Sequence, residues 1–467
     1  MKKEDLYEAI NHIDDSYLQP SRRKNGLFLP LLAITTVVVI AMFLPHNEEP
    51  SPIAKSDETL IVNSSPIVIA QAKSPDMTYE KHDEWQVNET QFEAWYNAYI
   101  ENMRLSKEIQ PFLHPYEEAI MVHLLDENKN NVFSPLNLFM ALSMLSECTA
   151  SDTRQEILQV IGIEDLESLR SINRILWNAN ALDTPDIVSL PGSSIWLDNK
   201  RKYKTDTLDF MAEAYHSDSF AGTMGDPAYD SLLQQWLNEH TGNLLEEDTE
   251  IQTFKETNVL AIVTSMYYKE FFDAGFDPQE TTEGEFHTPE GVRQVDMMHS
   301  HASRKYYRRN GFQAITMPLN YSGEILFFLP DEGLNPTDIV DDIFPVIYQE
   351  ADYQYIPVHA ILPKLDLSTS TDMIPILEEL GISQAFNEAD FSTVYDEPAT
   401  VSEITHAVRL IIDEGGIEAA SYSLVNAEES EGGDTTEELE FMIDRPFVFA
   451  ITGLDGSILF AGTVANP

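Results

Sequence analysis

The chain has 467 residues, of which 43% are hydrophobic and 10% aromatic, and its formal net charge is -51. This apolar content excludes a disordered polymer and is sufficient for a large buried core. The excess of acidic residues, 79 against 28 basic ones, would repel phosphate backbones, so we expect no nucleic-acid binding. We interpret the charge mainly as a source of solubility outside the cell, and a basic partner would also fit it.

An uncharged apolar segment occupies residues 26–44 and has about the length that a bilayer core requires. Basic residues 22–24 precede it and acidic residues 48–49 follow it. Because basic flanks stay inside, we expect a single-pass helix in the cell membrane, with residues 1–25 cytoplasmic and the remainder extracellular. A cleaved secretory signal is the alternative, but no small-residue cleavage site follows the apolar run.

Two further regions follow the apolar segment. Residues 45–88 are rich in proline, serine and charge, which predicts a flexible linker. Residues 89–467 predict a globular domain in which helices and strands mix without strict alternation, an α+β pattern. Helical spacing is found at 92–103, 116–125, 136–148 and 153–160, the last with Ser151 or Asp152 as its N-cap, and buried strands are predicted at 259–268, 324–329, 408–412 and 447–451.

The sequence contains no recognisable catalytic motif. There is no nucleophile elbow, no paired-histidine zinc helix and no phosphate-binding loop. Cys148 is the single cysteine, so no intrachain disulfide can form, and its apolar helical context predicts a buried, inert thiol. His299 and His301 alternate along a possible strand, and we interpret them as surface histidines. We therefore expect a protein that is not an enzyme and has no metal or cofactor.

Several segments resemble the serpin family of serine protease inhibitors, and they occur in the family's order. The first ~85 residues lie outside this similarity. The matching segments are 131–137 (NVFSPLN), 153–158 (TRQEIL), 257–269, 276–286 with 295–298 (VDMM), 362–365 (LPKL), 380–392, 406–408 (HAV), 413–420 (DEGGIEAA), 445–449 (RPFVF) and 459–467.

The resemblance implies a fold of three β-sheets and eight or nine helices, with an exposed reactive loop at about residues 414–440. It also implies a suicide mechanism, in which a serine protease forms an acyl-enzyme with the loop and the cut loop inserts into the main sheet as a new strand. The catalytic serine then belongs to the target, which becomes a covalent partner, and we expect the inhibitor itself to be a monomer. The layout of anchor and linker suits a Gram-positive bacterium.

The loop sequence is compatible with burial as a strand. Because side chains of a strand alternate between two faces, one face receives only small or apolar residues, namely Ile417, Ala419, Ser421, Ser423, Val425 and Ala427. A charge on that face would cost several kcal/mol and would stall insertion. By resemblance, the loop hinge comprises Glu414, Gly415, Gly416, Ile417, Glu418, Ala419 and Ala420.

The resemblance also implies a hydrogen-bonded latch beneath the main sheet, formed by Ser134 and His406. Two positions depart from the family. Thr264 stands where an asparagine is often found near the histidine, and Phe272 stands where a tryptophan is frequent at the top of the sheet. We therefore expect the latch to form with altered details.

Counting from the hinge glutamate as the family does places the scissile bond at Ser430–Glu431. The loop is longer than usual before Pro446, so Glu429, Glu431 or the region 433–434 are alternatives. Residues 414–440 contain no lysine or arginine, which argues against a trypsin-like target and favours an elastase-like or glutamyl-specific protease. A non-inhibitory serpin that serves as a surface binding or adhesion module, or an inhibitor of a cysteine protease, are the other interpretations.

Overall fold

The computed structural model describes residues 59–60, 66–72, 89–183, 187–241, 253–256, 258–320, 323–387, 389–396, 400–417 and 438–467. The predicted membrane segment and most of the predicted reactive loop lie outside these ranges. Within them, no helix combines the length and the apolar character needed to cross a membrane.

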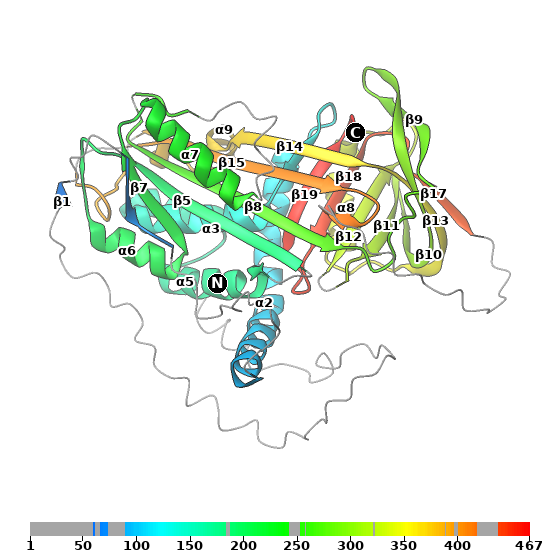
Figure 1. Ribbon diagram of the computed structural model, residues 1–467, viewed down its shortest axis with the longest axis horizontal. Helices are drawn as coiled ribbons and strands as arrows, with labels where there is room; N and C mark the ends of the chain where they lie inside the picture. The colour runs from blue at the N-terminus through cyan, green and yellow to red at the C-terminus, as the bar shows by residue number, and fades with distance from the viewer. Residues whose placement is uncertain are drawn as a thin grey trace.

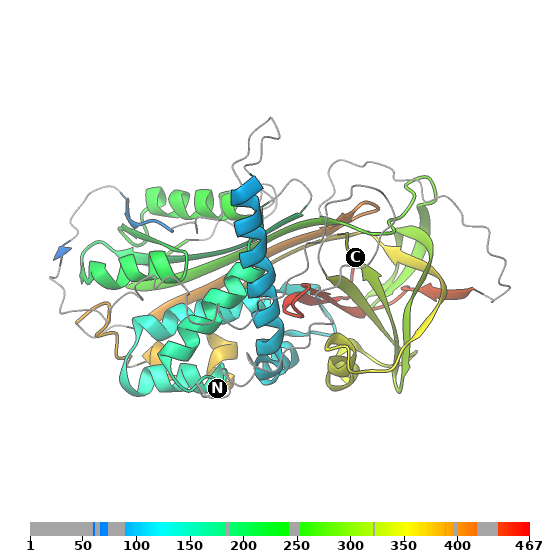
Figure 2. The same cartoon turned by 90° about the horizontal axis from the view of Figure 1, so that it is seen from below.

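An eight-stranded sheet, the main sheet, forms one half of the molecule, with helices on both faces (Figures 1 and 2). Because β8 is covered on both sides, its sequence is an almost continuous buried run rather than an alternating one. In spatial order the strands are β14 (Leu365–Asp372), β15 (Val401–Ile412), β16 (Gly416–Ile417), β8 (Leu260–Phe271), β5 (Ile187–Asp198), β7 (Ser217–Gly222) and β2 (Ile67–Ala70), and β4 (Leu182–Asp183) pairs with β5 alone.

A nine-stranded sheet forms the other half (Figure 1). Its order is β17 (Leu439–Met442), β13 (Gln354–Pro363), β10 (Gly291–Arg309), β11 (Phe312–Pro318), β12 (Glu324–Pro330), β18 (Phe447–Thr452), β19 (Ile458–Val464) and β3 (Asn131–Phe133), with β9 (Thr282–Thr288) on β10. A third, two-stranded sheet joins β1 (Thr59–Leu60) to β6 (Lys202–Tyr203). The long β8 and β10 link distant segments, as the α+β prediction requires.

The described residues contain nine α-helices, which confirms the expectation of eight or nine. Figure 2 shows α2 standing across the molecule where its two halves meet. The helices are α2 (Glu89–Leu124), α3 (Pro135–Cys148), α4 (Ser151–Val160), α5 (Leu166–Asn180), α6 (Thr205–Ala214), α7 (Pro227–His240), α8 (Val340–Ile347), α9 (Ile374–Glu379) and α10 (Gln384–Asn387), with a 3₁₀ turn η3 (Pro336–Ile339) before α8.

Two helix boundaries differ from the prediction. The predicted helices 92–103 and 116–125 are one helix that continues through Pro111 and Pro115, because buried packing on both sides of the prolines outweighs the lost hydrogen bonds. The N-cap of α4 is Ala150, without a side-chain cap. Ser151 is instead the first residue of the helix, and its hydroxyl donates to Asp390 Oδ2 at 2.7 Å.

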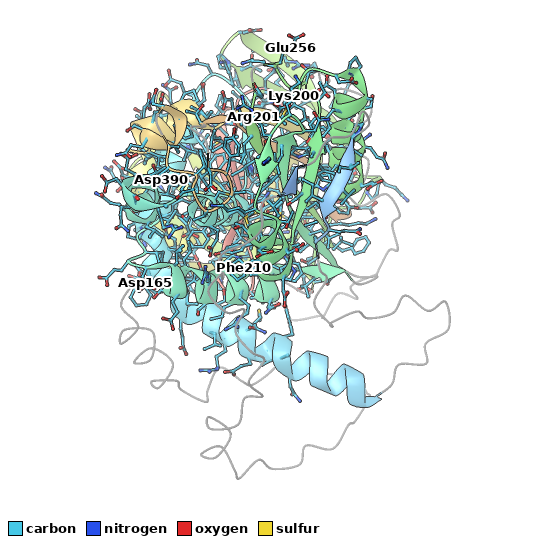
Figure 3. The ribbon with its side chains drawn as sticks, turned by 90° about the vertical axis from the view of Figure 1, so that its left-hand side faces the viewer. Asp165, Lys200, Arg201, Phe210, Glu256 and Asp390 are labelled. Carbon is cyan, nitrogen blue, oxygen red and sulfur yellow. The ribbon has the colours of Figure 1, made fainter. Side chains whose placement is uncertain are left out.

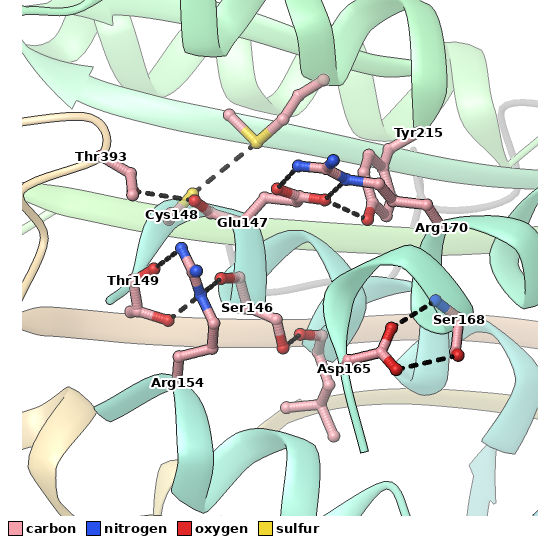
Figure 4. A network of polar contacts seen from close by, with 12 residues as sticks. Ser146, Glu147, Cys148, Thr149, Arg154, Asp165, Ser168, Arg170, Tyr215 and Thr393 are labelled. Carbon is pink, nitrogen blue, oxygen red and sulfur yellow. Dashed lines mark hydrogen bonds and ion pairs between the residues drawn. The ribbon is translucent and has the colours of Figure 1, made fainter. Parts of the chain in front are cut away.

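A buried carboxylate ties the helices beneath the main sheet together (Figure 4). Glu147 accepts two hydrogen bonds from Arg170, at 2.6 and 2.8 Å, and one from the Tyr215 hydroxyl at 2.7 Å. At this end of the molecule (Figure 3), the Arg170 guanidinium also lies 4.6 Å from the centre of the Phe210 ring. Beside this network, burial raises the pKa of the Cys148 thiol to about 12, so the thiol is inert, as its context predicted.

The expectation of a flexible linker over residues 45–88 is wrong for the part that the structure describes. β2 pairs antiparallel with β7 at the edge of the main sheet, and the amide of Ala72 donates to Asp218 Oδ1 at 2.8 Å. Ala70 is buried and Val68 is exposed, although the two residues are only two positions apart, because the register of β2 on β7 shifts between them. A four-residue apolar run in a polar context gave little signal, and β7 supplies the hydrogen-bonding edge that the sequence could not show.

Replacing Ala70 with Asp should therefore destabilise the protein by about 2 kcal/mol, because the new carboxylate would be buried without a partner. Denaturant unfolding of the full-length protein measures the change. The matched control is Val68→Asp on the same strand, which places its charge in solvent and should leave the unfolding midpoint unchanged. Equal midpoints for wild type and both variants would show that β2 contributes nothing to the fold.

Candidate functional site

The two central strands of the main sheet run parallel and pair over only part of their length. β15 pairs with β8 from Val401 and Leu260 to Val408 and Met266. Beyond these residues the two strands separate, although both continue to Ile412 and Phe271. We call the paired part the seam. Parallel pairing is slightly weaker per residue than antiparallel pairing, and the seam is the parallel pair whose two strands already separate at one end.

The space above the seam is occupied by β16, the start of the predicted reactive loop. Ile417 is the register partner of Ile412 on β15 and of Glu270 on β8, and both pairings are antiparallel. The Ile417 side chain is fully buried. The chain therefore enters the main sheet between β15 and β8, and its continuation along the same line would be a strand antiparallel to both neighbours.

A network of hydrogen bonds fixes the turn that leads into β16. The Glu414 carboxylate lies 2.7 Å from Lys364 Nζ and accepts from the Thr281 hydroxyl at 2.7 Å. Its carbonyl oxygen accepts from the Phe276 amide at 2.9 Å. Burial alone would raise the pKa of Glu414, but the ammonium and the hydroxyl outweigh burial and lower it. The glutamate is thus held as an anion, and it anchors the first residue of the hinge.

Gly416 is the hinge position at which the backbone demands glycine. Its φ is +151°, and a Cβ at this residue would lie 2.2 Å from the carbonyl oxygen of Glu270. No side chain fits there without moving β8. The close approach lets two residues of the hinge join the sheet before any cleavage.

The predicted latch partners lie together beneath the seam. The amide of Ser134, the N-cap of α3, donates to His406 Nε2 at 2.9 Å. On the other side of the ring, His406 Nδ1 lies 3.1 Å from the hydroxyl of Thr264, its register partner across the seam. Thr264 thus provides the contact that its place near the histidine suggested.

The tautomer of His406 follows from its partners. An amide can only donate, so Nε2 must carry the lone pair and Nδ1 the proton, which is donated to the Thr264 oxygen. Burial lowers the pKa of His406 to about 4. The latch therefore requires a neutral imidazole, and a second proton on Nε2 would face the amide proton of Ser134.

The remaining predicted residues fall into two groups. Glu418, Ala419, Ala420, Glu429, Ser430 and Glu431 lie outside the described residues, so the scissile bond stays a prediction. His299 and His301 lie on β10 and contact His359 and Glu438. In the described part of the chain, no three potential ligands are arranged to hold a metal ion.

Comparison of the sequence with known proteins agrees with this geometry. The family model described as Serpin (serine protease inhibitor) matches residues 119–467. The chain belongs to the serpin family. Among curated relatives, Alpha-1-antiproteinase 2 of Equus caballus is 28% identical over 381 residues, which cover 77% of this chain and 87% of the relative. A serpin-like protein of Thermococcus kodakarensis is 24% identical over 359 residues, which cover 73% of this chain and 82% of that protein.

Solved structures share the serpin fold. The thermophilic serpin tengpin in its native state superposes with a TM-score of 0.70 at 18% identity, covering 86% of this chain and all of tengpin. Human thyroxine-binding globulin, solved with its hormone, gives a TM-score of 0.68 at 22% identity and covers 78% of this chain and 99% of its own. The similarity at these identities concerns the fold alone.

Sequence reasoning missed three residues that position the hinge of this serpin. Lys364 and Thr281 hold the Glu414 carboxylate, and a Cβ on Gly275 would lie 2.8 Å from the Glu414 carbonyl oxygen. Lys364 was part of the matching segment 362–365, so its presence was visible but its role was not. The ion pair joins residues far apart in the chain, and only the fold brings them together.

Proposed function

We propose that this serpin inhibits a serine protease by inserting its cut reactive loop into the main sheet. The position of β16 carries the proposal, because the loop's first residues already lie between β15 and β8 with the polarity that a new central strand requires. The protease would cut within the loop, and the released segment would continue from Ile417 down the seam.

A comparison of the backbone hydrogen bonds before and after insertion indicates that insertion is favourable. The seven register pairs of the seam would be replaced by two antiparallel ladders, one on each side of the new strand, so backbone hydrogen bonds are gained on balance. The residues from Ile417 to Ala427 that would face the core carry no charge. The latch at His406 resists opening until insertion supplies these new bonds, which keeps the seam of the uncut protein closed.

The loop chemistry supports an elastase-like or glutamyl-specific target. Small and acidic residues surround the predicted bond Ser430–Glu431, and residues 414–440 offer no basic side chain for a trypsin-like pocket. A net charge of -51 would in addition draw a basic protease toward the inhibitor and repel an acidic one.

We place the serpin domain outside the cell, tethered through residues 26–44. The length and flanking charges of this segment support the placement. An epitope at the C-terminus should be accessible to antibody on intact cells. An epitope that is reached only after permeabilisation would contradict this orientation.

The inhibitory function is tested by incubating the full-length protein, in detergent, with elastase-like, glutamyl-specific and papain-like proteases. A serine protease should give an adduct that survives denaturing electrophoresis, and mass spectrometry of the released C-terminal peptide should identify the cut near residues 429–431. Cleavage without an adduct for every protease would overturn the proposal and favour a non-inhibitory surface module. An adduct with the papain-like enzyme alone would assign a cysteine protease as the target.

A further inference from the structure

Three histidines gather on neighbouring strands of the nine-stranded sheet. His299 and His301 lie on β10 and His359 lies on β13, where it is the register partner of His301. His299 Nδ1 and His359 Nε2 are 3.1 Å apart, and the rings of His301 and His359 stack with centroids 4.1 Å apart. The other nitrogen of His299 lies 3.1 Å from the Thr282 hydroxyl on β9. We call these three side chains the histidine cluster.

The strand that follows the predicted reactive loop meets this cluster. β17 pairs with β13 at the edge of the sheet (Figure 1). Glu438, the first described residue after the loop, places Oε2 3.0 Å from His301 Nδ1. Glu440 is the register partner of His359. The cluster and β17 therefore bring three imidazoles and two carboxylates to one edge.

The contacts limit how many protons the cluster can hold. The hydrogen bond between His299 and His359 needs one nitrogen with a lone pair, so this pair accepts one additional proton and a second would break the bond. His301 lies beside Glu438, whereas His359 stacks on His301 and contacts His299, so a charge on His359 would meet two other histidines. The contact between His301 and Glu438 is therefore the one that a proton strengthens.

The groups around His359 together lower its pKa, so the acid-dependent contact is that of His301 with Glu438. Desolvation lowers the pKa of His359, as do His301 and His299, whereas Glu438 and Glu440 raise it. Glu438 also acts electrostatically on the buried Arg304 of β10. The hydrogen-bond partners of the Arg304 guanidinium are Ser300 Oγ at 2.6 Å and the Val358 carbonyl oxygen at 3.1 Å. Arg304 is cationic throughout the pH range in which histidines titrate, so it cannot supply a pH-dependent change.

We propose that the histidine cluster is a proton-operated clasp that holds β17, and hence the C-terminal end of the reactive loop, more firmly in mildly acidic than in alkaline medium. In alkaline medium the Glu438 carboxylate faces a neutral imidazole at His301, and in mildly acidic medium it would face an imidazolium. The inference depends on the proposed function only in treating residues 418–437 as the reactive loop.

Amide hydrogen exchange of the full-length protein in detergent tests the clasp without any protease. With a chelator present, the protection factors of the amides in β17, corrected for intrinsic exchange, should be about threefold higher at pH 6 than at pH 8, as expected for one partly exposed ion pair. His301→Gln should remove most of this rise. The matched control is His123→Gln on α2, an exposed histidine outside the cluster, which should preserve it.

A second variant keeps the test decisive if His301→Gln does not fold. Glu438→Gln keeps all three histidines and should also reduce the rise, because it removes the carboxylate that contacts His301. Equal protection at the two pH values in the wild type would overturn the clasp. So would a rise that persists in both cluster variants. Loss of the adduct with intact pH-dependent protection would instead count against the inhibitory function alone.

Discussion

Replacing Ile417 with Arg is expected to turn the protein from an inhibitor into a substrate. Ile417 is already fully buried between β15 and β8 in the uncut protein, so an arginine there would place an unpaired charge at the point from which insertion must continue. Such burial costs several kcal/mol. Since about 1.4 kcal/mol changes a rate tenfold, the yield of adduct should fall by at least about tenfold, while loop cleavage proceeds.

The matched control is Ile417→Thr, which places a smaller side chain at the same position without charge and should retain the adduct. The ratio of adduct to cleaved protein is measured on denaturing gels at increasing ratios of inhibitor to protease. An unchanged ratio in the arginine variant would refute the register in which Ile417 faces the core.

Acidification is expected to weaken the fold through the latch at His406. Its folded-state pKa is about 4, below the ordinary value of about 6.5, so the folded state binds fewer protons than the unfolded state between these values. The stability that the neutral histidine contributes is therefore fully present above pH 6.5 and is lost as the pH falls toward 4. The expected loss is about 3 kcal/mol.

The variant His406→Gln isolates this contribution. It should be less stable than wild type at pH 7, because the hydrogen bonds to Ser134 and Thr264 change, but its stability should fall less steeply between pH 6.5 and 4. Glu117 acts in the opposite direction, since burial raises its pKa to about 8, and it is common to both proteins. Denaturant unfolding at a series of pH values measures the difference, and parallel curves for the two proteins would contradict the assigned role of His406.

The sequence was most informative where the physics is local. Continuous apolar runs placed β8, β12 and β18, and the Gly415–Gly416 pair marked a hinge that the structure places at a close approach between backbones. Structural features that depend on contacts between distant segments could not be predicted from the sequence. The continuity of α2 through Pro111 comes from packing, and the pairing of β2 depends on the free edge of β7.

The candidate site shows the same difference between local features and contacts of distant segments. Ser134 and His406 were identified by resemblance, but the tautomer of the histidine follows only from the amide and the hydroxyl that face it. Lys364 contacts Glu414 because the junction of β13 and β14 meets the hinge in space. The histidine cluster was visible in the sequence as His299 and His301 alone, since His359 and Glu438 are brought to them by strand pairing.

The central claim is that the cut loop becomes a strand between β15 and β8. Thermal unfolding of the intact protein and of the same protein cleaved within residues 418–437 tests it most directly. Insertion adds two antiparallel ladders to the main sheet, so the cleaved form should unfold at a temperature well above that of the intact form. A cleaved form that unfolds at the same or a lower temperature would contradict loop insertion.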